Sequence, residues 1–223
     1  GKGRVERLAR EAGVHLLFGS PAYGRRAGRR EIELRNRAFL LNPEGFEVGE
    51  YDKLFLVPFG EYNPLPFVRQ IVEAAGNFTP GTDAHVLRFD GRAFGTLICY
   101  EGVQPDLPRR FVAKGAGFLV NITNDAWFGK TVAPYQHLVQ EAFRAAENKV
   151  PMVRAANTGV SAVIGPTGEI VAETGLYAEA LLAGEIHPRP GGTFYSRRGN
   201  LFAYAAMLYY AGSAVAGYLR RKT

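Results

Sequence analysis

Phe94-Gly-Thr-Leu-Ile-Cys-Tyr-Glu101 is an apolar run that ends in a thiol, a phenol and a carboxylate. The run predicts a buried strand, with ionisable groups where the strand ends. Cys99 is the only cysteine in 223 residues, which excludes an internal disulfide. Catalytic side chains gather at the carboxyl ends of strands in α/β folds, whereas a structural cysteine more often lies inside the apolar run. From this stretch alone, Cys99 is either a nucleophile or a small core residue.

Apolar runs and helical patterns alternate on both sides of this strand. Three connections carry turn signals typical of hairpins: Pro43-Glu-Gly45, Asp90-Gly91 and Pro166-Thr-Gly168. The expected strands are residues 14–19, 36–41, 47–51, 84–89, 92–98, 118–121, 152–156, 160–164, 169–173 and 181–186. The expected helices are residues 4–12, 106–114 and 134–149. Strands joined by both hairpins and helices indicate an α/β fold with a mixed sheet covered by helices.

The C-terminal segment differs in composition from the rest of the chain. Residues 201–219 contain no charged side chain, and as a helix they would span roughly 28 Å, close to the ~30 Å of a bilayer core. Basic residues flank the segment on both sides. We expect a transmembrane helix at residues 199–220, joined to a catalytic domain at residues 1–192 by a Pro- and Gly-rich linker. The alternative is an Ala-rich helix buried in the core.

Charge and histidine spacing argue against several other classes of protein. The net charge is +6, which fits a solvated basic surface, and the basic residues form no aromatic-interleaved repeat. We therefore expect no nucleic-acid partner. The histidines do not follow metal-ligand spacing, so we expect neither a metal nor a cofactor. The histidines are His15, His85, His137 and His187.

A thiol near neutral pH needs a base or a cation to become a thiolate, since a free cysteine has a pKa of ~8.5. Lys53 ends a predicted strand and precedes an apolar stretch, where its ammonium would favour a thiolate and stabilise an oxyanion. Glu61 would orient this lysine or accept a proton. The alternatives are a surface lysine and a rim or helix-start glutamate.

The residues after Cys99 offer further support for such a site. The Tyr100 backbone N–H lies next to the thiol and is placed to donate to an oxyanion. Glu101 would lie on the thiol's side of an extended chain, where it either supports the site or binds a backbone amide. Trp127 and Phe128 follow the strand at residues 118–121 and would line an acyl pocket, or pack on the core. His137 is expected on a helix near that pocket.

Three motifs together resemble the nitrilase superfamily, and within it the apolipoprotein N-acyltransferases. They are Tyr51-Asp-Lys-Leu-Phe-Leu-Val-Pro-Phe-Gly-Glu-Tyr62, Ile98-Cys-Tyr-Glu101 and Asn121-Ile-Thr-Asn-Asp-Ala-Trp-Phe-Gly129. The segments at 133–137, 144–148 and 154–161 fit the same family, so the resemblance covers essentially the whole chain. It favours Cys99 as the nucleophile.

The resemblance implies a four-layer αββα sandwich and a Glu-Lys-Cys triad, with Lys53 and Cys99 as two of its members. It gives Glu61, Tyr100 and Glu101 important roles. The implied reaction moves an acyl chain from a phospholipid, through a cysteine thioester, to the N-terminal amine of a diacylglyceryl apolipoprotein. The implied location is the bacterial inner membrane, with the catalytic domain on the periplasmic side. We expect a monomer.

One part of the family pattern has no match in this sequence. The triad glutamate belongs to a Pro-Glu motif, which we expect, with the family's N-terminal membrane helices, in a segment before Gly1. This chain alone would then lack the main general base, and we expect its turnover to fall short of that of a form with the upstream segment restored. The alternative functions are a soluble amidase of the same superfamily and a catalytically incomplete module that binds lipid or a partner.

Overall fold

The computed structural model describes residues 2–25, 32–64 and 77–221. Its helices are α1 (Lys2–Ala12), α2 (Asp106–Ala113), α3 (Ala133–Asn148), α4 (Phe194–Arg198) and α5 (Leu201–Arg220), with 3₁₀ helices η2 (Cys99–Val103) and η3 (Asp125–Phe128). Its strands are β1 (Leu16–Arg25), β2 (Ile32–Leu41), β3 (Glu47–Asp52), β4 (Leu87–Phe89), β5 (Arg92–Ile98), β6 (Phe118–Asn124), β7 (Met152–Asn157), β8 (Ala162–Ile164) and β9 (Ile170–Glu173).

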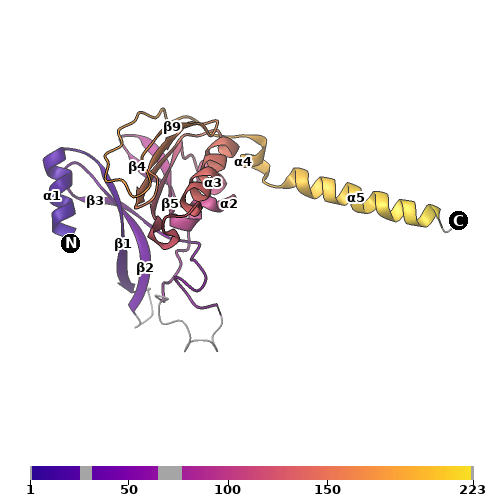
Figure 1. Ribbon diagram of the computed structural model, residues 1–223, viewed down its shortest axis with the longest axis horizontal. Helices are drawn as coiled ribbons and strands as arrows, with labels where there is room; N and C mark the ends of the chain where they lie inside the picture. Colours follow the sequence, from indigo (N-terminus) through magenta and orange to yellow (C-terminus); the bar gives the residue numbers. More distant parts are fainter. Residues whose placement is uncertain (1, 26–31, 65–76, 222–223) are drawn as a thin grey trace.

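Helices and sheets are stacked in layers (Figure 1). Helix α1 lies on one side of an antiparallel sheet β1-β2-β3, the mixed sheet β4-β5-β6-β7-β8-β9 follows, and α2 and α3 lie beyond it. The two sheets face each other, because a Cβ added at Gly19 of β1 would lie 3.1 Å from Ile122 of β6. The helix–sheet–sheet–helix order agrees with the expected αββα sandwich.

Strand β5 lies inside the larger sheet and carries Cys99 at its carboxyl end. It pairs antiparallel with β4 and parallel with β6, and every residue after Arg92 is buried. Burial on both faces explains why this strand reads as an unbroken apolar run. Asp90 and Gly91 both have positive φ (47° and 74°), the backbone that a two-residue hairpin turn requires. The predicted hairpin at this turn is confirmed.

The strand predicted at residues 181–186 is wrong, since the structure has no strand in that described stretch. A Cβ added at Gly184 would lie 2.6 Å from Val163 of β8. The segment therefore crosses over side chains of the sheet instead of pairing with its edge. The other predicted strands and helices between residues 84 and 173 are present with shifted ends.

Helix α5 projects away from the layered body (Figure 1). All of its residues are exposed, so the alternative of a buried core helix is wrong. Among the helices that the structure describes, none combines the length and the hydropathy of a membrane span. The tyrosines of α5 lower its mean hydropathy: Tyr204, Tyr209, Tyr210 and Tyr218. The transmembrane helix predicted at residues 199–220 is therefore not confirmed.

Gly95 lets α2 approach β5 closely. A Cβ at this position would lie 2.6 Å from Phe111 and 2.9 Å from Leu119, both buried. We expect Gly95→Ala to lower the free energy of unfolding by about 1–3 kcal/mol, because the packed core must shift. Urea unfolding measures this change. Gly24→Ala in β1, where a Cβ meets nothing within 4 Å, is the matched control. Equal stability of the two variants would contradict the proposed close packing.

Candidate active site

The turn that carries Cys99 starts where β5 ends. Cys99 is partly buried and has φ = 53°, a left-handed backbone that non-glycine residues rarely adopt. Such a conformation persists only where its surroundings hold it. The Ile98 N–H donates to Glu101 Oε2 (2.8 Å), and Asn121 Nδ2 donates to the Cys99 carbonyl (3.1 Å). Hydrogen bonds therefore fix the backbone on both sides of the thiol.

Glu101 joins this turn to the segment that begins at Lys53. Its Oε1 accepts hydrogen bonds from the Leu54 N–H (2.6 Å), the Phe55 N–H (3.1 Å) and the Tyr51 hydroxyl (2.9 Å). The residue after Lys53 and the residue before Cys99 thus donate to the same buried carboxylate. The sequence left open whether Glu101 supports the site or binds backbone amides, and the geometry shows that it binds amides from both segments.

Burial strongly affects the titration of this carboxylate. It raises the pKa of Glu101 to about 7, against the hydrogen bonds from Ile98, Phe55 and Leu54, which lower it. Burial and the neighbouring Glu101 carboxylate also raise the pKa of Tyr51, which therefore stays a phenol and a hydrogen-bond donor.

Lys53 and Glu61 form a buried ion pair. The lysine is 1% exposed and its Nζ donates to Glu61 Oε2 at 2.7 Å. Glu61 also accepts from the Val57 N–H and from Asn36 Nδ2, both at 2.8 Å. The alternative of a surface lysine is therefore wrong. The Glu61 carboxylate compensates the buried lysine for part of its lost hydration.

The remaining predicted site residues occupy different environments. Tyr100 lies in η2 with its side chain 42% exposed, and Trp127 of η3 is 81% exposed. The rings of Phe128 and His137 meet edge to face at 5.9 Å. His137 itself is 4% exposed. Trp127 therefore does not pack on the core, and the pocket-lining roles of Trp127, Phe128 and His137 stay predictions.

Next to His137 is a buried charged cluster that the sequence analysis did not single out. Arg154 of β7 donates to Glu141 of α3 and to Asp125 of η3, and all three are at most 1% exposed. His137 Nδ1 lies 3.1 Å from Asp125, and its Nε2 lies 3.3 Å from Glu141. Two signals were available: an arginine in a buried strand, and a glutamate four residues after a histidine on a helix.

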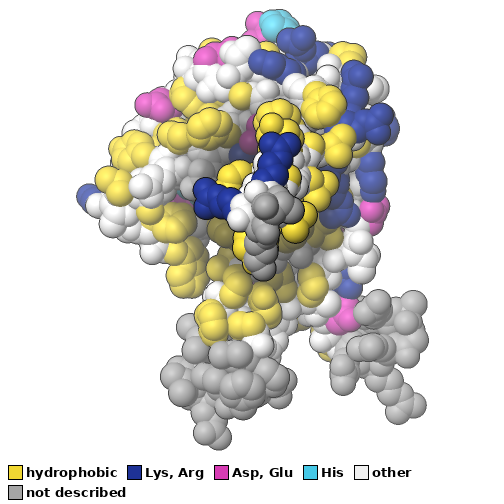
Figure 2. Space-filling model, turned by 90° about the vertical axis from the view of Figure 1, so that its right-hand side faces the viewer, with side chains coloured by type: hydrophobic (Ala, Val, Ile, Leu, Met, Phe, Trp, Pro, Cys, Tyr) yellow, Lys and Arg dark blue, Asp and Glu magenta, His cyan; other side chains and the backbone are white. Residues whose placement is uncertain are grey.

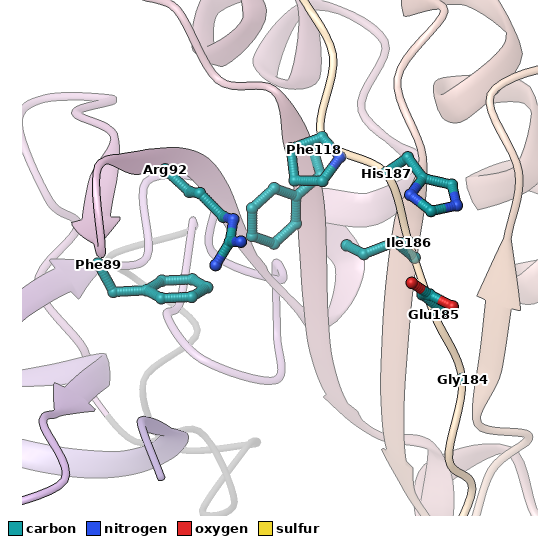
Figure 3. Close-up of a pocket in the computed structure, with 8 residues that line it drawn as sticks. Phe89, Arg92, Phe118, Gly184, Glu185, Ile186 and His187 are labelled. Atoms are coloured by element: carbon teal, nitrogen blue, oxygen red, sulfur yellow. The ribbon is translucent and has the colours of Figure 1, made fainter.

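Two cavities lie at the end of the larger sheet opposite to Cys99. One, of about 410 Å³, is lined by Phe89, Arg92, Phe118 and residues 184–188, at the amino ends of β5 and β6 (Figure 3). The second, of about 310 Å³, shares Glu185, Ile186 and His187 with it. Cys99 follows the opposite end of β5. Within residues 2–25, 32–64 and 77–221, no group of His, Cys, Asp and Glu is arranged to hold a metal ion.

The sequence profile of the carbon-nitrogen hydrolase family matches residues 3–190. The chain belongs to this family. A protein named apolipoprotein N-acyltransferase from Geobacter metallireducens is 46% identical over 99% of this chain and 42% of its own length. Proteins of the same name from Brucella suis (39% identical; 85% of this chain, 36% of theirs) and Haemophilus influenzae (31%; 98% and 43%) are also similar. The predicted resemblance is confirmed, and the chain spans roughly two fifths of these relatives.

Solved structures share the fold. An amidase from Nesterenkonia sp. AN1 is 26% identical, with a TM-score of 0.58, covering 78% of this chain and 62% of that one. That structure is a mutant with the acetamide moiety of fluoroacetamide added covalently at its active-site cysteine. A carbon-nitrogen hydrolase from Helicobacter pylori G27 is 19% identical, with a TM-score of 0.62, over 80% of this chain and 63% of its own, and shows the fold alone.

The raised pKa of Glu101 predicts a pH-dependent stability. Its folded pKa of about 7 lies above the ordinary value of 4.5 for a glutamate, so the folded state binds this proton more tightly than the unfolded state does. The contribution of this proton to the free energy of unfolding is complete below pH 4.5 and is lost as the pH rises through 7. We expect Glu101→Gln to reduce the loss of unfolding free energy between pH 5 and pH 8 by about 1–3 kcal/mol. Urea unfolding at both pH values measures it.

Glu44→Gln is the control for this comparison, because Glu44 is an exposed carboxylate. It should leave the difference between the two pH values as in the parent chain. If Glu101→Gln also leaves it unchanged, the proton on Glu101 does not contribute to stability as described.

Proposed function

We propose that this chain carries the acyl-transfer site of an apolipoprotein N-acyltransferase. One observation carries the proposal: a single buried carboxylate, Glu101, hydrogen-bonds the backbone beside Cys99 and the backbone beside Lys53. A thiol and a buried ammonium are thereby held on adjoining segments, which is the requirement for a thiolate nucleophile. The 46% identity to the Geobacter metallireducens protein supports the choice of reaction.

In the first step, the Cys99 thiolate attacks the ester carbonyl carbon of a phospholipid acyl chain. A C–S bond forms, and the carbonyl electrons move to an oxyanion, which Lys53 and the Tyr100 N–H stabilise. Collapse of this intermediate breaks the C–O bond and releases a lysophospholipid, whose alkoxide oxygen takes up the proton that the Cys99 thiol lost on forming the thiolate. Glu61, paired with Lys53 at 2.7 Å, orients the ammonium through this step.

In the second step, the α-amine of a diacylglyceryl-cysteine apolipoprotein attacks the thioester. A C–N bond forms, the C–S bond breaks, and the thiolate of Cys99 is restored. The amine loses a proton to a general base. Water competes with the amine, so an apolar pocket that excludes it favours transfer over hydrolysis. Trp127 and Phe128 are proposed to line that pocket, with His137 fixing the Phe128 ring.

The proposed substrates are lipids, and exposed apolar side chains support a contact with a membrane. Figure 2 views the molecule from the side on which α5 projects, and shows hydrophobic side chains around that helix and basic ones along the right-hand edge. We infer that α5 contacts lipid, with Arg197 and Arg198, at the end of the preceding helix α4, near the headgroups. The bacterial inner membrane, a periplasmic catalytic domain and a monomer are parts of the same proposal.

Hydrolysis of small amides is the second candidate function. It is favoured by the likeness to the Nesterenkonia amidase, in which a cysteine carries a covalently added acetamide moiety. An amidase would use the same thiolate on an amide carbonyl and would resolve the thioester with water. The exposed apolar helix α5 has no role in that reaction.

Incubation of the chain with phospholipid carrying a labelled acyl chain tests the proposal. We expect label on the protein that neutral hydroxylamine releases, as a thioester, and that Cys99→Ala abolishes, because Cys99 is the only cysteine. Label that persists in Cys99→Ala, or no label on the parent chain, would contradict the proposal. Hydrolysis of butyramide without labelling by phospholipid would favour the amidase instead.

A further inference from the structure

The turn that carries Cys99 rests directly on the buried charged cluster. Gly102, within η2, is the point of contact: an added Cβ would lie 2.5 Å from Glu141 Oε1 and 2.7 Å from Asn121 Nδ2. The backbone of the turn therefore touches both side chains, with no room between them. Of the residues that follow the thiol, Gly102 is the one whose missing side chain allows this approach.

Glu141 is held in place by Arg154, which is itself fixed by several acceptors. It is fully buried, and Arg154 Nη1 donates to its Oε1. The same guanidinium donates to Asp125 through Nη2 and to the Val160 carbonyl through Nε (2.9 Å). Because three acceptors from different segments fix Arg154, the carboxylate that it holds is fixed too. Glu141 thus presents a rigid surface to the turn.

Asn121 makes the second contact between the core and the turn. It is fully buried on β6, its Nδ2 donates to the Cys99 carbonyl, and its Oδ1 has no hydrogen-bond partner among the described residues. Buried polar atoms normally have a hydrogen-bond partner, so an amide whose oxygen lacks one is costly. The hydrogen bond that its nitrogen makes to the Cys99 carbonyl is the contribution that offsets this cost. That bond holds Cys99 in its left-handed conformation (φ 53°).

We propose that Glu141, held by Arg154, is a positioning residue that seats Gly102 and thereby sets the direction of the Cys99 thiol. This inference rests on the proposed role of Cys99 as nucleophile. The carboxylate does not react. It sets the distance between the turn and α3, and the turn sets the position of the Cys99 thiol relative to Lys53. Displacement of a reacting atom by about 1 Å is enough to cost roughly a hundredfold in rate.

Asp125 provides a matched comparison for Glu141. Both carboxylates accept from Arg154 and both are at most 1% exposed. Asp125, however, lies against Gly159, where an added Cβ would be 2.4 Å from its Oδ2. Loss of either charge disturbs the same guanidinium, but only Glu141 supports the turn. A merely structural role of the cluster would make the two substitutions equivalent.

The test is the alkylation of Cys99 by iodoacetamide, which needs no lipid substrate and reports one thiol, since the chain has no other. We expect Glu141→Gln to lower the rate constant at pH 7 roughly tenfold or more and to move the pH profile of alkylation. Asp125→Asn should change the rate by less than about twofold, with a comparable fall in melting temperature. Gly102→Ala should act like Glu141→Gln, because its Cβ displaces the turn without removing a charge.

Two outcomes would overturn the inference. One is an unchanged rate and pH profile in both Glu141→Gln and Gly102→Ala; where Glu141→Gln does not fold, Gly102→Ala decides alone. The other is an equal fall in the rate constant of Cys99 alkylation in Glu141→Gln and Asp125→Asn. Failure of the proposed function appears elsewhere, as a missing acyl-thioester on the parent chain, so the two failures are distinguishable.

Discussion

The site depends on one buried carboxylate that connects two distant segments. Glu101 accepts hydrogen bonds from backbone N–H groups on both sides of the site, at Ile98 and at Leu54 and Phe55. Backbone N–H groups left without partners in a core are costly, so this carboxylate stabilises both segments at once. It also brings a lysine and a cysteine from different sheets to the same end of the sandwich.

Buried charge is concentrated around this point and is compensated within two groups. Lys53 pairs with Glu61 on one side, and Arg154 pairs with Glu141 and Asp125 on the other. Removing one partner of such a pair leaves an uncompensated charge in the core, which costs several kcal/mol. A core without charged side chains would not be exposed to this cost. The buried ion pairs add rigidity, which a site that requires a fixed thiol and a desolvated ammonium needs.

Local signals in the sequence predicted much of the fold. The hairpin at Asp90-Gly91 follows from turn chemistry, and β5 follows from an apolar run of strand length. The run at 181–186 has similar local character but forms no strand, because pairing with a sheet edge depends on where the segment lies in three dimensions. The span at 199–220 was predicted from its lack of charged residues, a criterion that does not count the uncharged tyrosines, which lower the mean hydropathy of α5.

The site was predictable only in part. Cys99, Lys53, Glu61 and Glu101 stand in motifs, so the sequence indicated their chemistry. The bonds that connect them were not visible there, because the partners of Glu101 on the lysine segment lie 46 to 50 residues away in the chain. Asp125, Glu141 and Arg154 come from three separate elements and form a cluster only once η3, α3 and β7 are packed together.

The central proposal is that the buried Lys53 side chain activates the Cys99 thiol. The rate of Cys99 alkylation at pH 7 in Lys53→Met, compared with the parent chain, tests it most directly. The account predicts a fall of about tenfold or more, because the neighbouring cation that favours the nucleophile is removed. Lys114→Met, which removes an exposed lysine paired with Asp83, should leave the rate unchanged. An equal rate in Lys53→Met and the parent chain would contradict the account.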